Sequence, residues 1–230
     1  MRALTLAVLF APLLAGLAAD EPPSGVVSGV VRFTGEVPKA KLIPTTDGGM
    51  IEHRDLVVDG KTKGLRSVLV LLEDAPAQPK LEKAEAAVMD QRDMLFLPRV
   101  LAVQDGRPVR FENNDLCNHS VHAASTVKAN QLNVIAGPGQ PVTHTFEVQK
   151  PPVLIGCALH GWMRGWVYVV PHPWFAVTDD QGGFRIAKAP VGKYKLAFSH
   201  ADTNLRETRM IEVKAGEETK VQVDWDKLPK

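Results

Sequence analysis

Short apolar runs, rather than long stretches of helical period, recur along this chain. Residues 25–33 are rich in valine and bounded by glycines, and in residues 67–72 a serine is followed by a continuous run of valine and leucine. Both patterns are typical of β-strands, the second of a buried one. No long amphipathic helix is evident. Short strands separated by frequent turns predict an all-β fold built from sandwiches.

The middle of the chain predicts closely spaced strands. The expected strands cover residues 86–90, 99–103, 108–112, 142–146, 153–157 and 165–170. Asp105-Gly106 separates two of them and predicts a β-hairpin. Residues 75–80, which contain two prolines, predict a linker before this region.

The last part of the chain again predicts strands. They cover residues 175–178, 184–186, 194–198, 210–213 and 219–223. Turns rich in Gly, Asp and Pro separate them, as in a second small sandwich.

The N-terminus has the layout of a secretory signal peptide. Arg2 precedes an apolar run that ends in small residues, which predicts removal of residues 1–19. An uncleaved membrane anchor is the alternative, but the run is short for a span. Without Arg2, basic and acidic residues are equal in number, which argues against nucleic acid as a partner. We expect a periplasmic or secreted protein without an integral membrane span.

One segment carries recognisable chemistry. Cys157, His160 and Met163 lie three residues apart between two predicted strands. Blue-copper sites combine two histidines and a cysteine in a trigonal arrangement with a weak axial methionine. Zinc would normally take four strong ligands, and methionine is a poor ligand for it. The segment therefore favours one type 1 copper ion.

The second histidine has to come from another segment. Residues 113–122 offer His119 and His122 near the start of a strand. Position alone leaves both open as ligands.

Residues 84–171 resemble the cupredoxin family, specifically amicyanin. The Cys-x-x-His-x-x-Met loop has amicyanin spacing, whereas plastocyanin and azurin use longer loops. The stretches at residues 94–98, 119–122 and 163–170 are also similar to amicyanin. The resemblance implies a Greek-key sandwich, and it implies that His119 rather than His122 is the ligand. The implied metal set is His119, Cys157, His160 and Met163.

Three positions depart from that family. Ser120 stands where amicyanin has an asparagine that ties the two ligand loops together. Leu159 stands where a proline is common, and Gly156 precedes the cysteine in place of a larger side chain. Hydrogen bonds and apolar cover around the sulfur tune the reduction potential, so the family's potential does not transfer.

Cys117 provides the main alternative. Two cysteines in an exported protein commonly form a disulfide, and Cys117 is two residues from His119. A Cys117–Cys157 bond would make the protein a structural β-sandwich. Cys117 could also be a small buried residue or take a second metal role.

The flanking segments resemble the carboxypeptidase-regulatory-like, or transthyretin-like, sandwich. Residues 178–186 and 189–196 carry this resemblance, and the opening strands of such a module precede the cupredoxin region. We therefore expect residues 24–80 and 172–228 to form one discontinuous domain around a cupredoxin domain at residues 81–171. A continuous C-terminal domain with an N-terminal extension is the alternative.

The function expected from these features is electron transfer. The copper site would exchange single electrons with redox partner proteins that dock near His160 and Trp162. Copper delivery without redox exchange is the alternative. An enzyme is disfavoured, because four ligands would leave no open position for substrate and no nucleophile–base pair is evident.

Overall fold

The computed structural model describes residues 22–45 and 48–229 of the 230-residue chain. In this part of the chain the regular structure consists of strands and one short 3-10 helix, η1 (Lys128–Asn130). The all-β prediction is confirmed. The predicted signal peptide, residues 1–19, lies outside the described residues. Among the described residues, no helix has the length and apolar character needed to cross a membrane.

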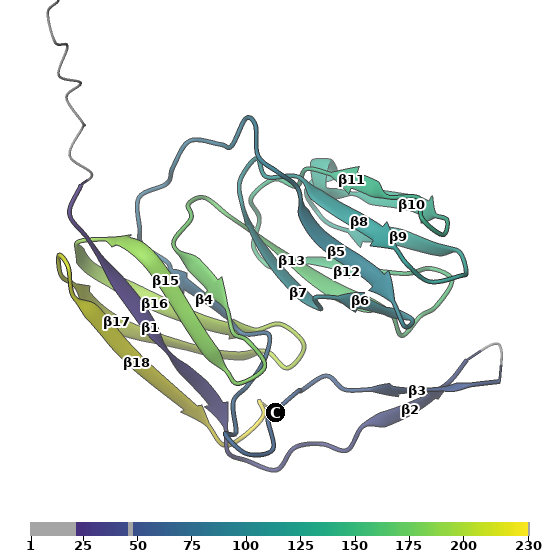
Figure 1. The fold of residues 1–230 in the computed structure, drawn as a ribbon, viewed down its shortest axis with the longest axis horizontal. Coiled ribbons are helices and arrows are strands. Elements are labelled where there is room, and N and C mark those ends of the chain that lie inside the picture. The colour runs from purple at the N-terminus through teal and green to yellow at the C-terminus, as the bar shows by residue number, and fades with distance from the viewer. Residues whose placement is uncertain (1–21, 46–47, 230) are drawn as a thin grey trace, which may run out of the picture.

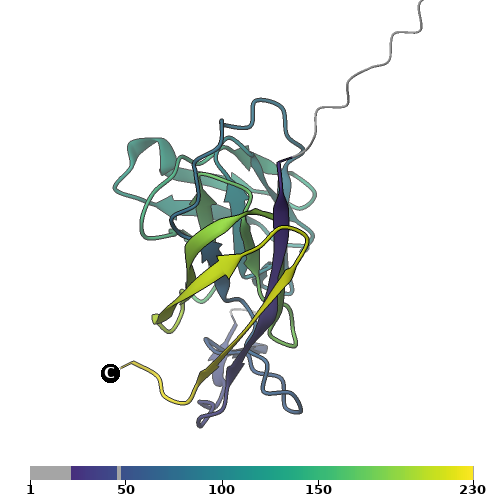
Figure 2. The same ribbon diagram turned by 90° about the vertical axis from the view of Figure 1, so that its left-hand side faces the viewer.

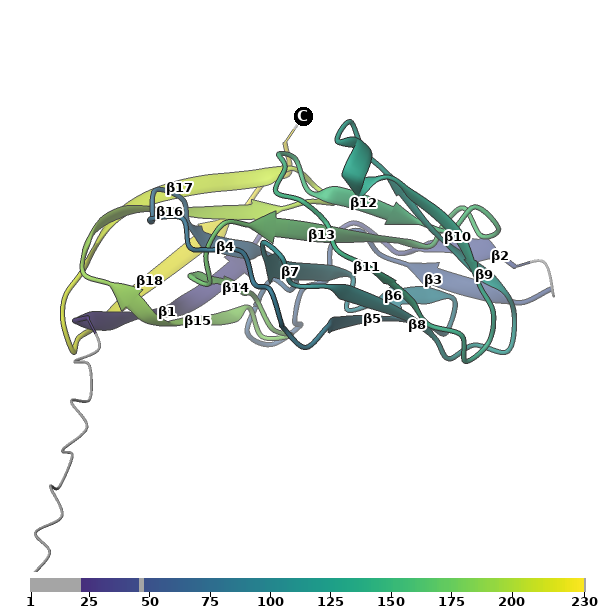
Figure 3. The same cartoon turned by 90° about the horizontal axis from the view of Figure 1, so that it is seen from above.

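The molecule is elongated and has two β lobes and a projecting hairpin (Figures 1 and 3). The split lobe contains strands from both ends of the chain, at residues 24–33 and 69–72 and within residues 175–225. The central lobe contains the strands within residues 87–170. The hairpin consists of β2 (Lys41–Pro44) and β3 (Met50–His53).

The split lobe is a sandwich of two sheets. One sheet has the order β15 (Gly183–Pro190), β1 (Ser24–Phe33), β18 (Glu218–Trp225), and Figure 2 shows it from outside. The other has the order β14 (Phe175–Val177), β4 (Leu69–Leu72), β16 (Gly192–His200), β17 (Leu205–Val213). Apolar side chains from both sheets fill one core, which includes Val27, Val31, Val70, Leu72, Ile186, Leu196, Phe198 and Val223.

Strand β1 is central to its sheet because it pairs antiparallel with β15 and parallel with β18. Gly29 allows the close approach to β18. A Cβ at this position would lie 1.7 Å from the backbone oxygen of Val221. Its lack of a side chain is therefore a packing requirement.

The central lobe is a second sandwich. One sheet has the order β10 (Leu132–Ala136), β9 (His119–Ala124), β12 (Val153–Gly156), β13 (Arg164–Val170), β7 (Val100–Gln104). The other has the order β11 (Val142–His144), β8 (Val109–Asn113), β5 (Ala87–Arg92), β6 (Leu95–Leu97). Their shared core includes Met89, Phe96, Phe111, Val121, Phe146, Ile155, Cys157, Met163 and Val167.

The hairpin predicted at Asp105-Gly106 is wrong, although the turn itself forms. The Arg107 N–H donates to the carbonyl of Gln104 at 3.0 Å, and Gly106 has φ +87°. However, β7 pairs with β13, whereas β8 pairs with β5 and β11. The chain therefore crosses from one sheet to the other at this turn. Val103 and Val109 then enter the same core from opposite sides.

The β2–β3 hairpin was not predicted from the sequence. Its residues are mostly exposed, and Leu42 is 67% exposed. An isolated two-stranded hairpin is marginally stable in water. At its base, Asp55 lies 3.2 Å from Arg99 of the central lobe, and His53 lies 2.9 Å from Asp55.

The chain leaves the split lobe after β4 and returns at β14. These two strands are antiparallel neighbours, with Leu71 opposite Phe175. The outgoing and returning segments also touch, because the Gln78 N–H donates to the carbonyl of Pro171 at 2.8 Å. The predicted linker, residues 75–80, contains no strand.

Contact between the lobes is both apolar and charged. Leu69, Val100 and Tyr168 form a small buried cluster between them. Arg99 binds the carboxylate of Asp202 through two nitrogens, at 2.6 and 2.8 Å, and the side chain of Asp202 is 2% exposed.

Candidate metal centre

His119, Cys157 and His160 converge at one end of the central lobe. His119 begins β9, and the other two follow β12. The Nδ1 atoms of the two histidines lie 3.0 Å apart. The Cys157 Sγ lies 3.6 Å from Nδ1 of His160 and 4.0 Å from Nδ1 of His119. Two imidazoles and a thiol therefore point at a common position.

The spacing of these three atoms fits a metal ion. A point equidistant from them lies about 2.1 Å from each, close to metal–imidazole and metal–thiolate bond lengths. All three side chains are buried, and His119 is 0% exposed. The donor set of two imidazoles and one thiolate in a trigonal arrangement suits copper.

Met163 closes the loop that carries two of these residues. Its N–H donates to the carbonyl of His160 at 2.9 Å, and its carbonyl accepts from the N–H of Cys157 at 3.2 Å. The side chain is 1% exposed and packs in the same core cluster as Cys157. The loop is therefore compact and tied at both ends, while the axial role of Met163 stays a prediction.

Ser120 connects the two ligand segments. Its hydroxyl accepts from the N–H of Ala158 at 2.7 Å, and its own N–H donates to the Cys157 sulfur at 3.3 Å. Ser120 therefore links the segment that carries His119 to the segment that carries Cys157.

Asp115 orients His119 from behind, a contact that the sequence reasoning missed. Its Oδ2 lies 2.8 Å from Nε2 of His119. A carboxylate on the outer nitrogen fixes the tautomer that turns Nδ1 toward the other donors. Asn113, 1% exposed, holds the same segment through bonds to the carbonyls of Cys117 and Ala136. The i, i+4 spacing of Asp115 and His119 is the one sequence signal that could have suggested the pair.

The environment favours the thiolate of Cys157. Burial opposes ionisation, but contacts with His119, the backbone N–H groups of Ser120 and Leu159, and His160 outweigh it and lower the pKa to about 6. For His119, burial disfavours the imidazolium, but contacts with Cys157 and Asp115 outweigh it and raise the pKa. The thiolate is the form of cysteine that binds metals.

The other two candidate ligands from the sequence, His122 and Cys117, do not face the point on which the three residues converge. His122 is exposed on β9, away from the cluster. Cys117 is exposed and is not bonded to Cys157. The two thiols lie against different nitrogens of His119, because the Cys117 Sγ is 3.7 Å from Nε2 whereas Cys157 faces Nδ1. A ligand atom of Cys117 also lies within 4.8 Å of ligand atoms of His119 and His160. We favour Cys157, because it faces Nδ1 of both histidines.

The segments that carry the converging residues also carry exposed apolar side chains. His160 is 9% exposed, the most exposed of the three converging residues. Leu159 beside it is 50% exposed, and Leu116 is 99% exposed. The ring of Trp162 lies 5.4 Å from that of His160, and its Nε1 donates to the carbonyl of Met94.

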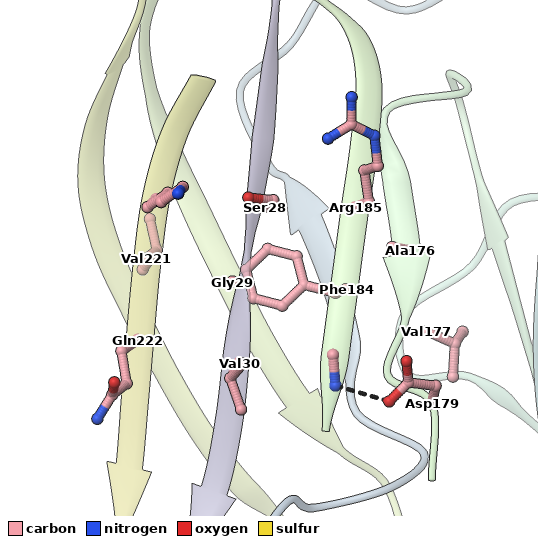
Figure 4. A pocket seen from close by; sticks show the side chains of 12 residues that line it. Ser28, Gly29, Val30, Ala176, Val177, Asp179, Phe184, Arg185, Val221 and Gln222 are labelled. Carbon is pink, nitrogen blue, oxygen red and sulfur yellow. Dashed lines mark hydrogen bonds between the residues drawn. The ribbon is translucent and has the colours of Figure 1, made fainter. Parts of the chain in front are cut away.

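A large groove lies on the split lobe, remote from this centre. It has a volume of about 740 Å³ and crosses β18, β1 and β15 (Figure 4). Its polar groups serve the local structure. Asp179 accepts from the N–H of Gly183 within its own turn, and Arg185 pairs with Glu218. The groove therefore offers no set of converging ligands comparable with the centre.

Comparison with known proteins gives structural matches to part of the chain. A reduced mutant form of amicyanin is 28% identical, and the match covers 38% of this chain and 86% of that one with a TM-score of 0.34. A purple cupredoxin from Nitrosopumilus maritimus is 21% identical over 36% of this chain and 98% of its own, with a TM-score of 0.31. A Cu-containing nitrite reductase from Thermus scotoductus SA-01 is 19% identical over 41% of this chain and 24% of its own, with a TM-score of 0.35.

No protein-family model matches the chain, and no curated protein matches it.

Proposed function

We propose that this protein is an exported type 1 copper protein that passes single electrons between redox partners. The observation that carries the proposal is the convergence of Nδ1 of His119, Nδ1 of His160 and Sγ of Cys157 at metal-binding distances. Met163 is the proposed axial ligand. Copper held there would supply a one-electron couple between Cu(I) and Cu(II).

The protein residues would keep the donor positions constant. Asp115 holds the tautomer of His119, and Ser120 links the two ligand segments. The Ser120 N–H also places a hydrogen bond on the thiolate sulfur. Donors fixed by their surroundings need little rearrangement when an electron arrives.

The proposed docking surface is the apolar area around His160. It contains Leu159, Trp162 and the almost fully exposed Leu116. Weak electron-transfer complexes use small interfaces, and tryptophan is a common interface anchor. Partner proteins would meet the centre at the edge of His160.

We also propose that residues 24–80 and 172–228 form one domain into which the copper domain, residues 81–171, is inserted. The support is that β4 and β14 pair directly and that the two lobes have separate cores. The split lobe would act as a scaffold.

The deciding experiment uses the two cysteines as a matched pair. Cu(II) is added to the purified wild-type chain, Cys157→Ser and Cys117→Ser, and visible spectra are recorded. We expect an intense orange-red absorption band in the wild type and in Cys117→Ser, and none in Cys157→Ser. The band should disappear with one electron equivalent of ascorbate and return on reoxidation. No band in the wild type, or a band that survives in Cys157→Ser, would contradict the proposal.

A further inference from the structure

A second group of soft metal donors lies on the outer side of His119. The Sγ of Cys117 is 3.8 Å from the Sδ of Met94 and 3.7 Å from Nε2 of His119. Cys117 is exposed, and Met94 is half-buried. Donor atoms of Cys117, His119 and His160 all lie within 4.8 Å of one another. A thiol and a thioether therefore meet at the surface beside the interior centre.

Hydrogen bonds hold the backbone of both segments in place. The carboxylate of Asp115 accepts from the N–H of Asp93 at 2.8 Å and from the N–H of Met94 at 3.0 Å. Met94 sits in the tight turn between β5 and β6 with φ +60°. On the other segment, Asn113 binds the carbonyl of Cys117 at 2.9 Å. The two sulfur atoms thus come from separate, anchored loops.

The chemistry of the pair selects a soft cation. Thiolate and thioether ligands suit Cu(I). With metal–sulfur bonds of roughly 2.3 Å, both sulfurs can bind one ion at an angle of about 110°. The carboxylate of Asp115 adds negative charge nearby while staying bound to His119. An ordinary thiol–thioether contact is the competing interpretation.

We propose that Cys117 and Met94 form a surface Cu(I) site, separate from the centre at Cys157. On binding, the Cys117 thiol releases its proton to solvent, a sulfur–copper bond forms, and copper stays Cu(I). Exposure of Cys117 leaves a coordination position for an incoming thiolate, so copper could be received there by ligand exchange. The proposal does not depend on electron transfer, because neither sulfur belongs to the interior donor set.

The test counts Cu(I) equivalents without oxygen, against the chelator bicinchoninate. We expect two equivalents on the wild type, one on Cys117→Ser and one on Cys157→Ser. Met94→Leu should weaken the second equivalent by about 10-fold or more. Met210→Leu, which removes an exposed thioether on β17 instead of the one beside Cys117, should keep both. X-ray absorption of Cys157→Ser loaded with one equivalent should show two sulfur neighbours.

The result that would overturn the site is a wild type that binds one equivalent, or a second equivalent that survives Cys117→Ser. Circular dichroism of each variant checks that the fold is kept. The visible band with Cu(II) is read separately. If the band is absent but Cys117→Ser still removes one Cu(I) equivalent, the surface site stands and the electron-transfer proposal fails.

Discussion

The two lobes differ in how they use buried histidines. In the central lobe, His119 and His160 face each other and a cysteine sulfur. Beside and within the split lobe, His53, His172 and His200 are also buried, at 4%, 1% and 2% exposure. Each of these has its own local contact, with Asp55, the N–H of Trp174 and Thr203 respectively. Burial of a histidine therefore does not indicate a site. Convergence with other donors does.

The most direct test of this difference between the lobes is to remove one buried histidine from each of them. We expect His119→Ala to lower Cu(II) affinity by at least about 100-fold, because the imidazole ligand that Asp115 orients is lost. His172→Ala should leave the affinity unchanged. Calorimetric titration with Cu(II) measures both. Equal losses in the two variants would show that the copper is not bound where we propose.

A second comparison concerns the ion pair between Arg99 and Asp202, which joins the lobes. In Arg99→Met the buried carboxylate of Asp202 loses its cation, which should cost about 3–5 kcal/mol in free energy of unfolding. Asp55→Asn, on the more exposed side of Arg99, should cost about 1 kcal/mol or less. Urea unfolding measures both free energies. If the lobes depend on this contact, Arg99→Met should also separate one transition into two, whereas equal small losses would argue against an ionic connection.

The pH dependence of stability should come partly from His200. Burial lowers its pKa to about 4, despite the opposing effect of Asp202, whereas an unfolded histidine titrates near 6.5. Between these values the unfolded chain binds a proton that the folded chain does not, so acid destabilises the fold. The slope should approach about 1 kcal/mol per pH unit between pH 6.5 and pH 4. His200→Gln should remove that part of the slope in unfolding measured at pH 7 and pH 5, and an unchanged slope would exclude His200 as its source.

The smallest expected effect comes from removing the Ser120 hydroxyl, which links the two ligand segments. Ser120→Ala leaves the N–H of Ala158 without its acceptor and should cost about 1 kcal/mol in stability. The backbone N–H at position 120 would still reach the sulfur. We therefore expect the visible band to persist and the reduction potential to shift. Ser125→Ala is a control outside the centre with a similar lost hydrogen bond, and it should not move the potential.

The ligand loop could be predicted from the sequence because its information is local. Cys157, His160 and Met163 are close along the chain, so spacing alone suggested a shared role. The choice of His119 required the family resemblance, because His122 lies on the same short strand. The structure distinguishes the two by burial.

Most strand positions could be predicted from the sequence, but which strands pair with each other could not. Alternation and β-branched content predict that a segment is extended, while pairing depends on tertiary packing. The turn at Asp105-Gly106 illustrates this, because its two strands enter different sheets. The Arg99–Asp202 pair, 103 residues apart, had no local signal. The contact between Met94 and Cys117 likewise had no local signal in the sequence.

The pairing of β4 with β14 bears on how the chain can fold. Bringing Leu71 to Phe175 closes a loop of roughly a hundred residues, a step with a substantial entropy cost if that loop is unstructured. If the central lobe folds first, its two ends already lie together at Gln78 and Pro171, and the closure becomes a local event. The slow, long-range step of the split lobe then becomes comparable to forming a short hairpin. Because the chain leaves and re-enters the split lobe at neighbouring strands, the entropy cost of folding that lobe depends on whether the central lobe has folded first.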